Sequence, residues 1–396
     1  MKILYHHRIR SKDGQFVHVE ELTEALKALG HTIVFVGPQA VHREKFGADA
    51  GAVAWMKKVL PGAVYELLEL GYAFGDLVRL VRALLKERPD IVYERYNLLF
   101  PSGAWLRSWF RVPLLLEVNA PLFEERSRFG GLALKRLARW SEVAVWRKAD
   151  HVFAVTEVLA QYVRAAAVPN ERLSIVANGI DWGKFAAVPD GSAMRRELGF
   201  EGKIVVGFTG FVRDWHGLDE LVKAVAQDPR MVLLVVGDGP ARASTEALAA
   251  QLGVSASVKF TGIVERHQVA SYVSTFDIAM QPDVVDYASP LKMIEYLALG
   301  RAIVSVDKPN IRELLVDGQN SLLFQPRRPD LMCAQIRRLC EDSALRQRLG
   351  AAARQTVLDR DLTWVGNARR VVAVAEQLLS SARAAPSVRP QPLDVD

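Results

Sequence analysis

The sequence predicts an α/β protein with two doubly wound domains, each a parallel sheet covered by helices on both faces. Three observations support this fold class. Short apolar, β-rich runs alternate with amphipathic helical patterns, the alternation occurs in both halves of the chain, and 396 residues suffice for two domains that each bury a core. Ligands of such sheets bind beyond the carboxyl ends of the strands, so two facing sheets would place the site in a central cleft.

The first half begins with a strand and an amphipathic helix. The helical pattern at 17–29 ends at Gly30, a residue suited to a left-handed C-cap, and Gly37-Pro38 ends the strand that follows. The strands of this half are predicted at 2–5, 31–36, 90–93, 113–117, 151–155 and 174–177. We assign residues 1–185 to the first Rossmann-like domain.

The second half repeats the pattern after a break near Asn178-Gly179 and a linker-like Pro-Asp-Gly-Ser at 189–192. Residues 192–361 form the second predicted domain. A last helix at about 362–381 is expected to pack back on the first domain, and 382–396 resemble a disordered tail. The strands are predicted at 204–209, 232–236, 257–260, 278–280, 302–305 and 321–324, and helices at 218–226, 242–252 and 291–299.

Composition excludes several classes of protein. With 50% hydrophobic and 24% charged residues, the chain is neither disordered nor a disulfide-stapled miniprotein. Cys333 and Cys340 are too far apart for a Cys-x-x-Cys pair, which favours a reducing compartment and argues against a zinc site. No apolar run approaches the ~20 residues that cross a bilayer, so we expect a cytoplasmic protein, soluble or peripheral at the inner face of the membrane. The net charge of +6 fits phosphorylated ligands or an anionic membrane, and no nucleic-acid motif accompanies it.

The segment 286–300 is the most informative motif. Ser289 is a good N-cap and Pro290 suits the first helical position, so a helix is expected to start there. The free N–H groups near Leu291 and Lys292 would form an anion site, to which Lys292 adds a full charge. Glu295, one turn further on, could reach sugar hydroxyls. The alternative interpretation is an ordinary capped surface helix.

A second motif, at 207–218, follows a predicted strand and precedes a helix. Gly210 allows a close backbone approach, and Arg213 and His216 are candidate donors to phosphate oxygens. Alternatively, His216 is a turn histidine that packs against Trp215.

Five sequence blocks in register resemble one known family, the retaining GT-B glycosyltransferases of family 4, over nearly the whole chain. Each block is modestly specific, but their order and spacing together are strongly so. The blocks are Gly14-Gln15-Phe16-Val17-His18-Val19 with Leu29-Gly30-His31-Thr32-Ile33, Asn178-Gly179-Ile180-Asp181 with Phe185, Gly237-Asp238-Gly239-Pro240, Phe260-Thr261-Gly262, and Glu295-Tyr296-Leu297-Ala298-Leu299-Gly300.

The resemblance implies a donor site in the second domain and an acceptor site in the first. Glu295 would hold the ribose, Ile263 and Val264 would meet the nucleotide base, and the turn from Ser289 to Lys292 would bind the diphosphate. The remaining expected donor contacts are Gly14, Gly210, His216, Gly239 and Tyr287.

This chain also departs from the family pattern. The family usually has two glutamates eight positions apart, but the first of these positions is Tyr287 here. Asp286 or Asp283 would then supply the missing carboxylate. The family's phosphate-binding Arg and Lys align with Phe211 and His216, so Arg213 is expected to take over the charge.

The implied reaction moves a hexose-type sugar from a nucleotide diphosphate sugar to a polysaccharide precursor, glycolipid or lipid-linked acceptor, with retention and attack from the leaving-group face. Fixed donors would stabilise the departing diphosphate, without a metal or other cofactor. The expected catalytic residues are Arg213, Lys292, Glu295 and Asp286.

Acceptor contacts are expected after the strand at 113–117, where Glu117 and Asn119 could bind a hydroxyl, unless this is only a solvated loop. Residues 105–148 interleave four tryptophans with basic residues, which suits an anionic membrane surface. The alternative is an amphipathic helix that packs its tryptophans inward.

Two other functions remain open. A non-catalytic paralogue or partner subunit that binds a nucleotide sugar would explain Tyr287 and Phe211. An epimerase or hydrolase with the same fold would turn over a nucleotide sugar without an acceptor, but it would need an acid/base set that the sequence does not show.

Overall fold

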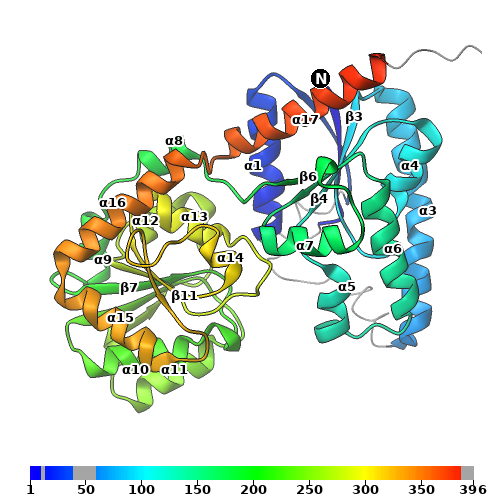
Figure 1. Cartoon of the computed structure of the whole chain (residues 1–396). Helices are drawn as coiled ribbons and strands as arrows, with labels where there is room; N and C mark the ends of the chain where they lie inside the picture. The colour runs from blue at the N-terminus through cyan, green and yellow to red at the C-terminus, as the bar shows by residue number, and fades with distance from the viewer. Residues whose placement is uncertain (10–13, 39–58, 385–396) are drawn as a thin grey trace, which may run out of the picture. The chain divides into compact units, whose positions relative to one another are not determined.

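The computed structural model describes residues 1–9, 14–38 and 59–384, and the chain forms two compact units (Figure 1). The first contains Met1–Ala154, Ala160–Val176 and the chain from Ala368, and the second contains Val155–Leu159 and Ala177–Asn367. All twelve predicted strands are present in the described residues, with ends shifted by at most two positions.

The first unit has a six-stranded parallel sheet in the order β2-β1-β3-β4-β5-β6. Its strands are β1 (Lys2–His6), β2 (Thr32–Val36), β3 (Ile91–Arg95), β4 (Leu114–Val118), β5 (His151–Ala154) and β6 (Leu173–Ile175). The central strands β3 and β4 are buried along their whole length, as expected for a parallel sheet covered on both faces.

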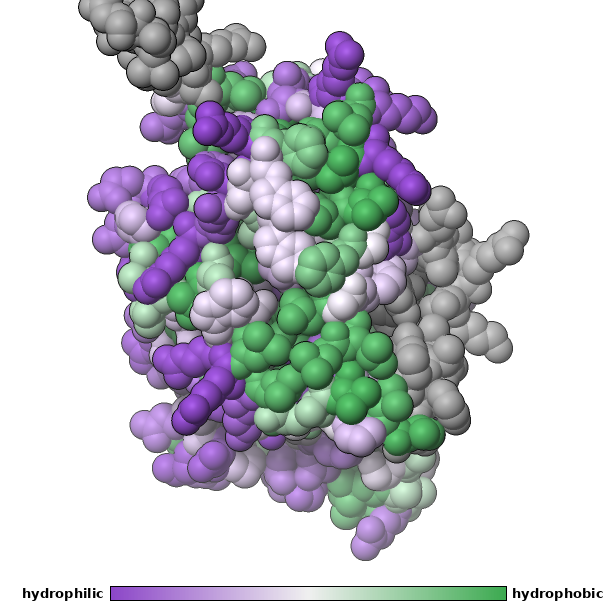
Figure 2. All heavy atoms as spheres, turned by 90° about the vertical axis from the view of Figure 1, so that its right-hand side faces the viewer, coloured by the Kyte–Doolittle hydropathy of each residue, from purple (hydrophilic) through white to green (hydrophobic). Residues whose placement is uncertain are grey.

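Helices cover both faces of this sheet, with α1 on one side and α3, α4 and α6 on the other (Figure 1). The longest of them, α3, was not among the helices predicted from the sequence. The helices are α1 (Gly14–Ala28), α3 (Gly62–Glu87), α4 (Ser102–Phe110), α5 (Leu122–Glu125), α6 (Lys135–Lys148) and α7 (Glu157–Ala165). The outer face of α3 and α4 carries many apolar side chains, green in Figure 2.

The second unit has the order β12-β11-β10-β7-β8-β9, again with every pair parallel. Its strands are β7 (Ile204–Thr209), β8 (Met231–Val236), β9 (Val258–Phe260), β10 (Ile278–Gln281), β11 (Ala302–Val306) and β12 (Leu322–Phe324). Its helices are α8 (Trp182–Ala186), α9 (Ser192–Leu198), α10 (Leu218–Gln227), α11 (Arg242–Gln251), α12 (Arg266–Val273), α13 (Leu291–Ala298), α14 (Pro309–Arg312), α15 (Pro329–Glu341) and α16 (Ser343–Asp359).

The domain limits differ from those drawn on the sequence. The first domain was predicted to end at residue 185, whereas the main segment of the second unit begins at Ala177, where residue 180 is hydrogen-bonded to residues 362 and 364 of that unit. The last helix, α17 (Trp364–Ala384), belongs to the first unit from Ala368 onward. It continues through residues 382–384 of the predicted tail, and residues 385–396 lie outside the described residues.

Candidate functional site

The strand order of the second sheet reverses between β7 and β10, and the predicted donor residues flank this point. Gly210 follows β7, and α13 follows β10 after a loop. Thr209 and Gln281, which end these two strands, each have a buried side-chain oxygen with no hydrogen-bond partner among the described residues. Parallel sheets bind ligands outside such a switch point, and buried orphan oxygens mark polar groups that an added molecule can satisfy.

Lys292 lies beside the end of β7. Its Nζ is 3.8 Å from the centroid of the Phe208 ring, and a Cβ atom on Gly210 would lie 3.2 Å from the same nitrogen. Burial lowers the pKa of Lys292 to about 7, although Glu295 one turn away acts in the opposite direction. The structure thus brings together Lys292 and Gly210, and an anion bound there would favour the charged ammonium.

His216 is buried against Phe208 and Trp215, with ring centroids 5.0 and 3.9 Å apart. Burial, with Lys292 and Arg213 nearby, lowers the pKa of His216 to about 3. The ring is therefore neutral, and its Nδ1 accepts a hydrogen bond from the backbone N–H of Arg213 at 3.2 Å. We assign the proton to Nε2, which leaves one N–H donor. The packing against Trp215 and the donor role are compatible.

Arg213 is exposed and its guanidinium lies 5.1 Å from the centroid of the Phe211 ring. This cation–π contact holds the guanidinium next to the position where the family has its arginine. That Arg213 takes over the charge of the family's arginine stays a prediction.

The glycines after β8 have a packing role. Loops after β7 and β8 are joined by backbone hydrogen bonds from Gly210 to Val236 and from Val212 to Asp238, both 2.9 Å. A Cβ atom on Gly239 would lie 2.2 Å from the Val212 carbonyl oxygen, so only glycine fits there. This contact gives Gly239 a packing role, and its donor contact stays a prediction.

Ile263 and Val264 follow β9 and a turn at Gly262, whose φ is +70°. The Ile263 side chain is exposed, whereas Val264 packs partly against the core. Of the two residues predicted to contact the base, Ile263 is therefore accessible from solvent, whereas Val264 is held partly in the core.

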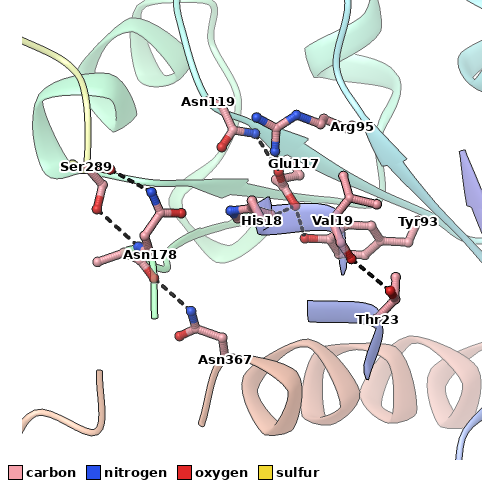
Figure 3. A network of polar contacts seen from close by, with 11 residues as sticks. His18, Val19, Thr23, Tyr93, Arg95, Glu117, Asn119, Asn178, Ser289 and Asn367 are labelled. Atoms are coloured by element: carbon pink, nitrogen blue, oxygen red, sulfur yellow. Dashed lines mark hydrogen bonds and ion pairs between the residues drawn. The ribbon is translucent and has the colours of Figure 1, made fainter. Parts of the chain in front are cut away.

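The start of α13 differs from the prediction. The helix begins at Leu291, Pro290 occupies the cap position, and among the described residues no side chain caps the first turn. The Ser289 hydroxyl instead accepts the backbone N–H of Asn178 at 3.1 Å, and the Asn178 side chain donates to the Ser289 carbonyl at 2.6 Å (Figure 3). Ser289 is therefore held by the Asn-Gly-Ile-Asp motif and is not the N-cap.

The carboxylates near Tyr287 share one cation that sequence analysis did not identify. The Nζ of Lys308 lies 2.7 Å from Asp283 and 3.0 Å from Asp286, and it also donates to the Val284 carbonyl at 2.6 Å. Lys308 lies just after β11, which ends at Val306. A lysine directly beyond a predicted strand is the sequence feature that could have identified it. Both aspartates are thus ion-paired with Lys308, and the replacement of the missing glutamate by one of them stays a prediction. The Tyr287 carbonyl accepts from Thr156 at 2.8 Å.

In the first unit, Glu117 is the centre of a buried network (Figure 3). The expectation that Glu117 binds an acceptor hydroxyl does not fit this arrangement, because four protein donors use its oxygens. Burial alone would raise the pKa of Glu117, but His18, Arg95 and Asn119 together hold it well below its usual range. Asn119 is half-buried and donates to Glu117. The four donors are His18 at 2.8 Å, Tyr93 at 2.7 Å, Arg95 and Asn119.

A second buried network lies at the end of β1. His6 is 2.7 Å from Glu94 and 2.8 Å from Asp76 of α3. Burial alone would lower the pKa of His6, but the two carboxylates raise it to about 9, so the ring is an imidazolium. Gly14 begins α1, and the residues just before it lie outside the described part of the chain.

The four tryptophans of 105–148 are divided between interior and surface. Trp146 is buried and Trp105 is half-buried, whereas Trp109 and Trp140 are exposed. The segment is therefore neither a surface that exposes all its tryptophans nor an amphipathic helix that packs all of them inward.

Two kinds of feature are absent from the described residues. No helix there is both long and apolar enough to span a bilayer. No group of three or more His, Cys, Asp or Glu side chains there could hold a metal ion.

Comparison with known proteins gives a consistent result. A family model described as glycosyl transferases group 1 matches residues 191–356, and one described as a glycosyl transferase 4-like domain matches residues 13–179. An uncharacterized glycosyltransferase of Methanocaldococcus jannaschii is 22% identical over 60% of both chains, so the match spans about three fifths of that relative. A D-inositol 3-phosphate glycosyltransferase of Jonesia denitrificans is 25% identical over 92% of this chain and 91% of its own. The crystal structure of HepE from Anabaena with UDP has a TM-score of 0.75 at 17% identity and covers 95% of this chain and 100% of its own, which shows a shared fold.

Proposed function

Because this chain belongs to the group 1 glycosyltransferases of family 4 and has their GT-B fold, we propose that it transfers a hexose-type sugar from a nucleotide diphosphate sugar, with retention at the anomeric carbon. The acceptor is a polysaccharide precursor, a glycolipid or a lipid-linked saccharide. The protein acts in the cytoplasm, at the inner face of the membrane.

The observation that carries this proposal is the position of Lys292 at the switch point of the second sheet, between the Phe208 ring and Gly210. A partly desolvated ammonium beside the neutral His216 forms a site for a diphosphate. Arg213 approaches from the exposed side of the same loop. Fixed cations and N–H donors stabilise the negative charge that develops on the leaving diphosphate.

In the proposed reaction, the bond from the anomeric carbon to the diphosphate breaks and a bond to the acceptor oxygen forms on the same face. The acceptor proton moves to an oxygen of the leaving diphosphate, so no carboxylate nucleophile is required. Glu295 holds the ribose of the donor. Asp286, paired with Lys308, fixes the loop beside the donor sugar. We propose that neither a metal nor another cofactor takes part.

The replacement of a glutamate by Tyr287 favours a second candidate, a nucleotide-sugar-binding paralogue without transferase activity. A panel of UDP-, GDP- and ADP-sugars distinguishes the candidates when thermal stabilisation and release of the nucleotide diphosphate are both measured. The proposal predicts stabilisation by one donor, lost in Lys292→Met, and release of free nucleotide diphosphate only with an acceptor extract.

Stabilisation without release under any condition would instead support the paralogue. Release without an acceptor would support a hydrolase. The matched control is Lys259→Met, which removes a lysine from the exposed middle of β9, away from the proposed diphosphate contacts.

A further inference from the structure

Side chains from outside the loop between β10 and α13 hold the backbone of that loop. We call residues 283–288 the donor loop, because they follow β10 at the switch point of the second sheet and lead toward α13. The side-chain amide of Gln281, at the end of β10, donates to the Asp283 carbonyl. The ammonium of Lys308, just after the neighbouring strand β11, donates to the Val284 carbonyl at 2.6 Å. Two successive carbonyls of the donor loop are thus fixed from two adjacent strands.

Asn310, in α14, holds the rest of the donor loop. Its side-chain amide donates to the Val285 carbonyl at 3.1 Å and to the Ala288 carbonyl at 2.7 Å. Asn310 is only 1% exposed, so water does not compete for these bonds. Four carbonyls of the donor loop therefore accept a hydrogen bond from a side chain that lies outside it in the sequence.

The amides of Gln281 and Asn310 each leave one oxygen unpaired. Both residues are buried, and neither Oε1 of Gln281 nor Oδ1 of Asn310 has a hydrogen-bond partner among the described residues. Unpaired buried oxygens cost stability and are uncommon in proteins. The arrangement that holds the donor loop is thus not the one that stability alone favours, which is typical of a functional site.

Lys308 also balances the charges of the donor loop. Its Nζ lies 2.7 Å from Oδ1 of Asp283 and 3.0 Å from Oδ1 of Asp286. Burial alone would lower the pKa of Lys308, but the two carboxylates raise it above its usual value, so the ammonium is charged at neutral pH. Without this cation, two carboxylates close to one another would repel and the donor loop would open.

We propose that Gln281, Lys308 and Asn310 form a clamp that positions the donor loop for the sugar of the nucleotide sugar. The three are positioning residues, because they act through the backbone and the carboxylates of the loop. The inference rests on the proposed function and deepens it, since it assigns the sugar to the donor loop and leaves the diphosphate at Lys292. Loss of the clamp should therefore weaken the binding of the nucleotide sugar but not that of the nucleoside diphosphate.

Calorimetric titration of the full chain with matched pairs of ligands tests this. The pairs are UDP and UDP-glucose, GDP and GDP-mannose, and ADP and ADP-glucose. Lys308→Met removes a charged donor and should weaken the binding of the nucleotide sugar about tenfold. Asn310→Ala removes a neutral donor and should weaken it about fivefold. The Kd of the matching nucleoside diphosphate should change by less than about twofold in both variants.

Each variant has a matched control in the second unit. Lys223→Met removes a lysine of α10 that also pairs with two carboxylates, Asp219 at 3.8 Å and Glu220 at 2.7 Å. Asn320→Ala removes a buried asparagine that donates to the Leu314 carbonyl at 3.2 Å. Both controls should bind the nucleotide sugar like the parent, although Asn320→Ala should lower the unfolding temperature much as Asn310→Ala does.

Removal of one negative charge gives a readout that a packing role would not move. In Lys308→Met the carboxylates of Asp283 and Asp286 lack their shared cation and repel each other. Asp283→Asn added to Lys308→Met should therefore restore about threefold of the lost affinity. Absence of this rescue would overturn the role of the Lys308 charge.

Amide hydrogen exchange of the ligand-free chain separates a failure of the clamp from a failure of the proposed function. Exchange at residues 283–288 should become faster in Lys308→Met and Asn310→Ala, but not in the two controls. If the parent bound none of the six ligands while exchange changed as expected, the proposed function and the role of the sugar would be wrong, and the hold of the clamp on the loop would be confirmed. Unchanged exchange, or an equal loss of affinity for the nucleotide sugar and its diphosphate, would overturn the clamp.

Discussion

At the scale of single residues, burial prepares Lys292 for a charged ligand. The ammonium is desolvated beside the Phe208 ring, so its pKa falls to about 7 in the free protein. A bound diphosphate favours the charged form and raises that pKa. Binding at pH 8 should therefore take up close to one proton at this site, and the affinity should fall as the pH rises above about 7.

Titration calorimetry in buffers of different ionisation enthalpy measures this uptake. Lys292→Arg keeps the positive charge at every accessible pH, so its proton uptake should be near zero. Equal uptake by the parent and by Lys292→Arg would assign the proton to another group.

His6 illustrates how two buried carboxylates control one imidazole. Its pKa is about 9 in the folded protein, against about 6.5 when unfolded. A raised pKa means that the stabilisation is complete below pH ~6.5 and is lost as the pH rises through about 9. The difference corresponds to about 3 kcal/mol of the stability of the first unit.

Calorimetric unfolding at several pH values checks this prediction. The transition of the first unit should move to lower temperature between pH ~6.5 and ~9.5 in the parent, but much less in His6→Gln. His267→Gln, at an exposed histidine, is the control and should retain the parent's pH dependence.

At the scale of elements, the segment at 178–181 positions the start of α13. Asn178 holds both the hydroxyl and the carbonyl of Ser289, and Gly179 allows contact with the backbone of residue 363, where a Cβ atom would lie 2.7 Å from the carbonyl carbon. Asn178→Ala removes the side-chain bond, worth about 1 kcal/mol. Amide hydrogen exchange should become faster at residues 289–293, and donor binding should weaken.

The control for this variant is Asn170→Ala, at an exposed position of the first unit. Unchanged exchange at residues 289–293 in Asn178→Ala would show that another contact holds the start of α13.

Some elements have a clear sequence pattern and were predicted, whereas others do not and were not. Strands such as β8 are continuous apolar runs, because parallel strands buried on both faces need no polar side. The helix α3 was not singled out, and it carries apolar residues on its outer face as well as toward the core. That distribution blurs the 3.6-residue period on which recognition of an amphipathic helix depends.

At the scale of the whole molecule, α17 joins the two units. Its first residues belong to the second unit and those from Ala368 onward to the first, where Val371 is buried. Val371→Asp places a charge in that core and should destabilise the first unit by several kcal/mol. Val365→Asp, at an exposed position of the same helix, should have little effect.

Calorimetry combined with donor binding separates the outcomes. The first unit should unfold at a lower temperature in Val371→Asp, while the second unit still binds the nucleotide. If nucleotide binding is lost and both units unfold at a lower temperature, the two units unfold as one.

Local sequence patterns were enough to predict the twelve strands, their alternation with helices and the glycine turns after β7 and β8, because these depend on neighbouring residues and short periods. They also located Lys292 and Gly210, which the fold brings together. Those patterns did not reveal that four donors saturate Glu117, that Lys308 pairs with Asp283 and Asp286, or that the Ser289 hydroxyl accepts from Asn178. These partners are up to 111 positions apart in the chain, and burial and hydrogen bonding over such separations arise from packing, which local sequence patterns do not encode.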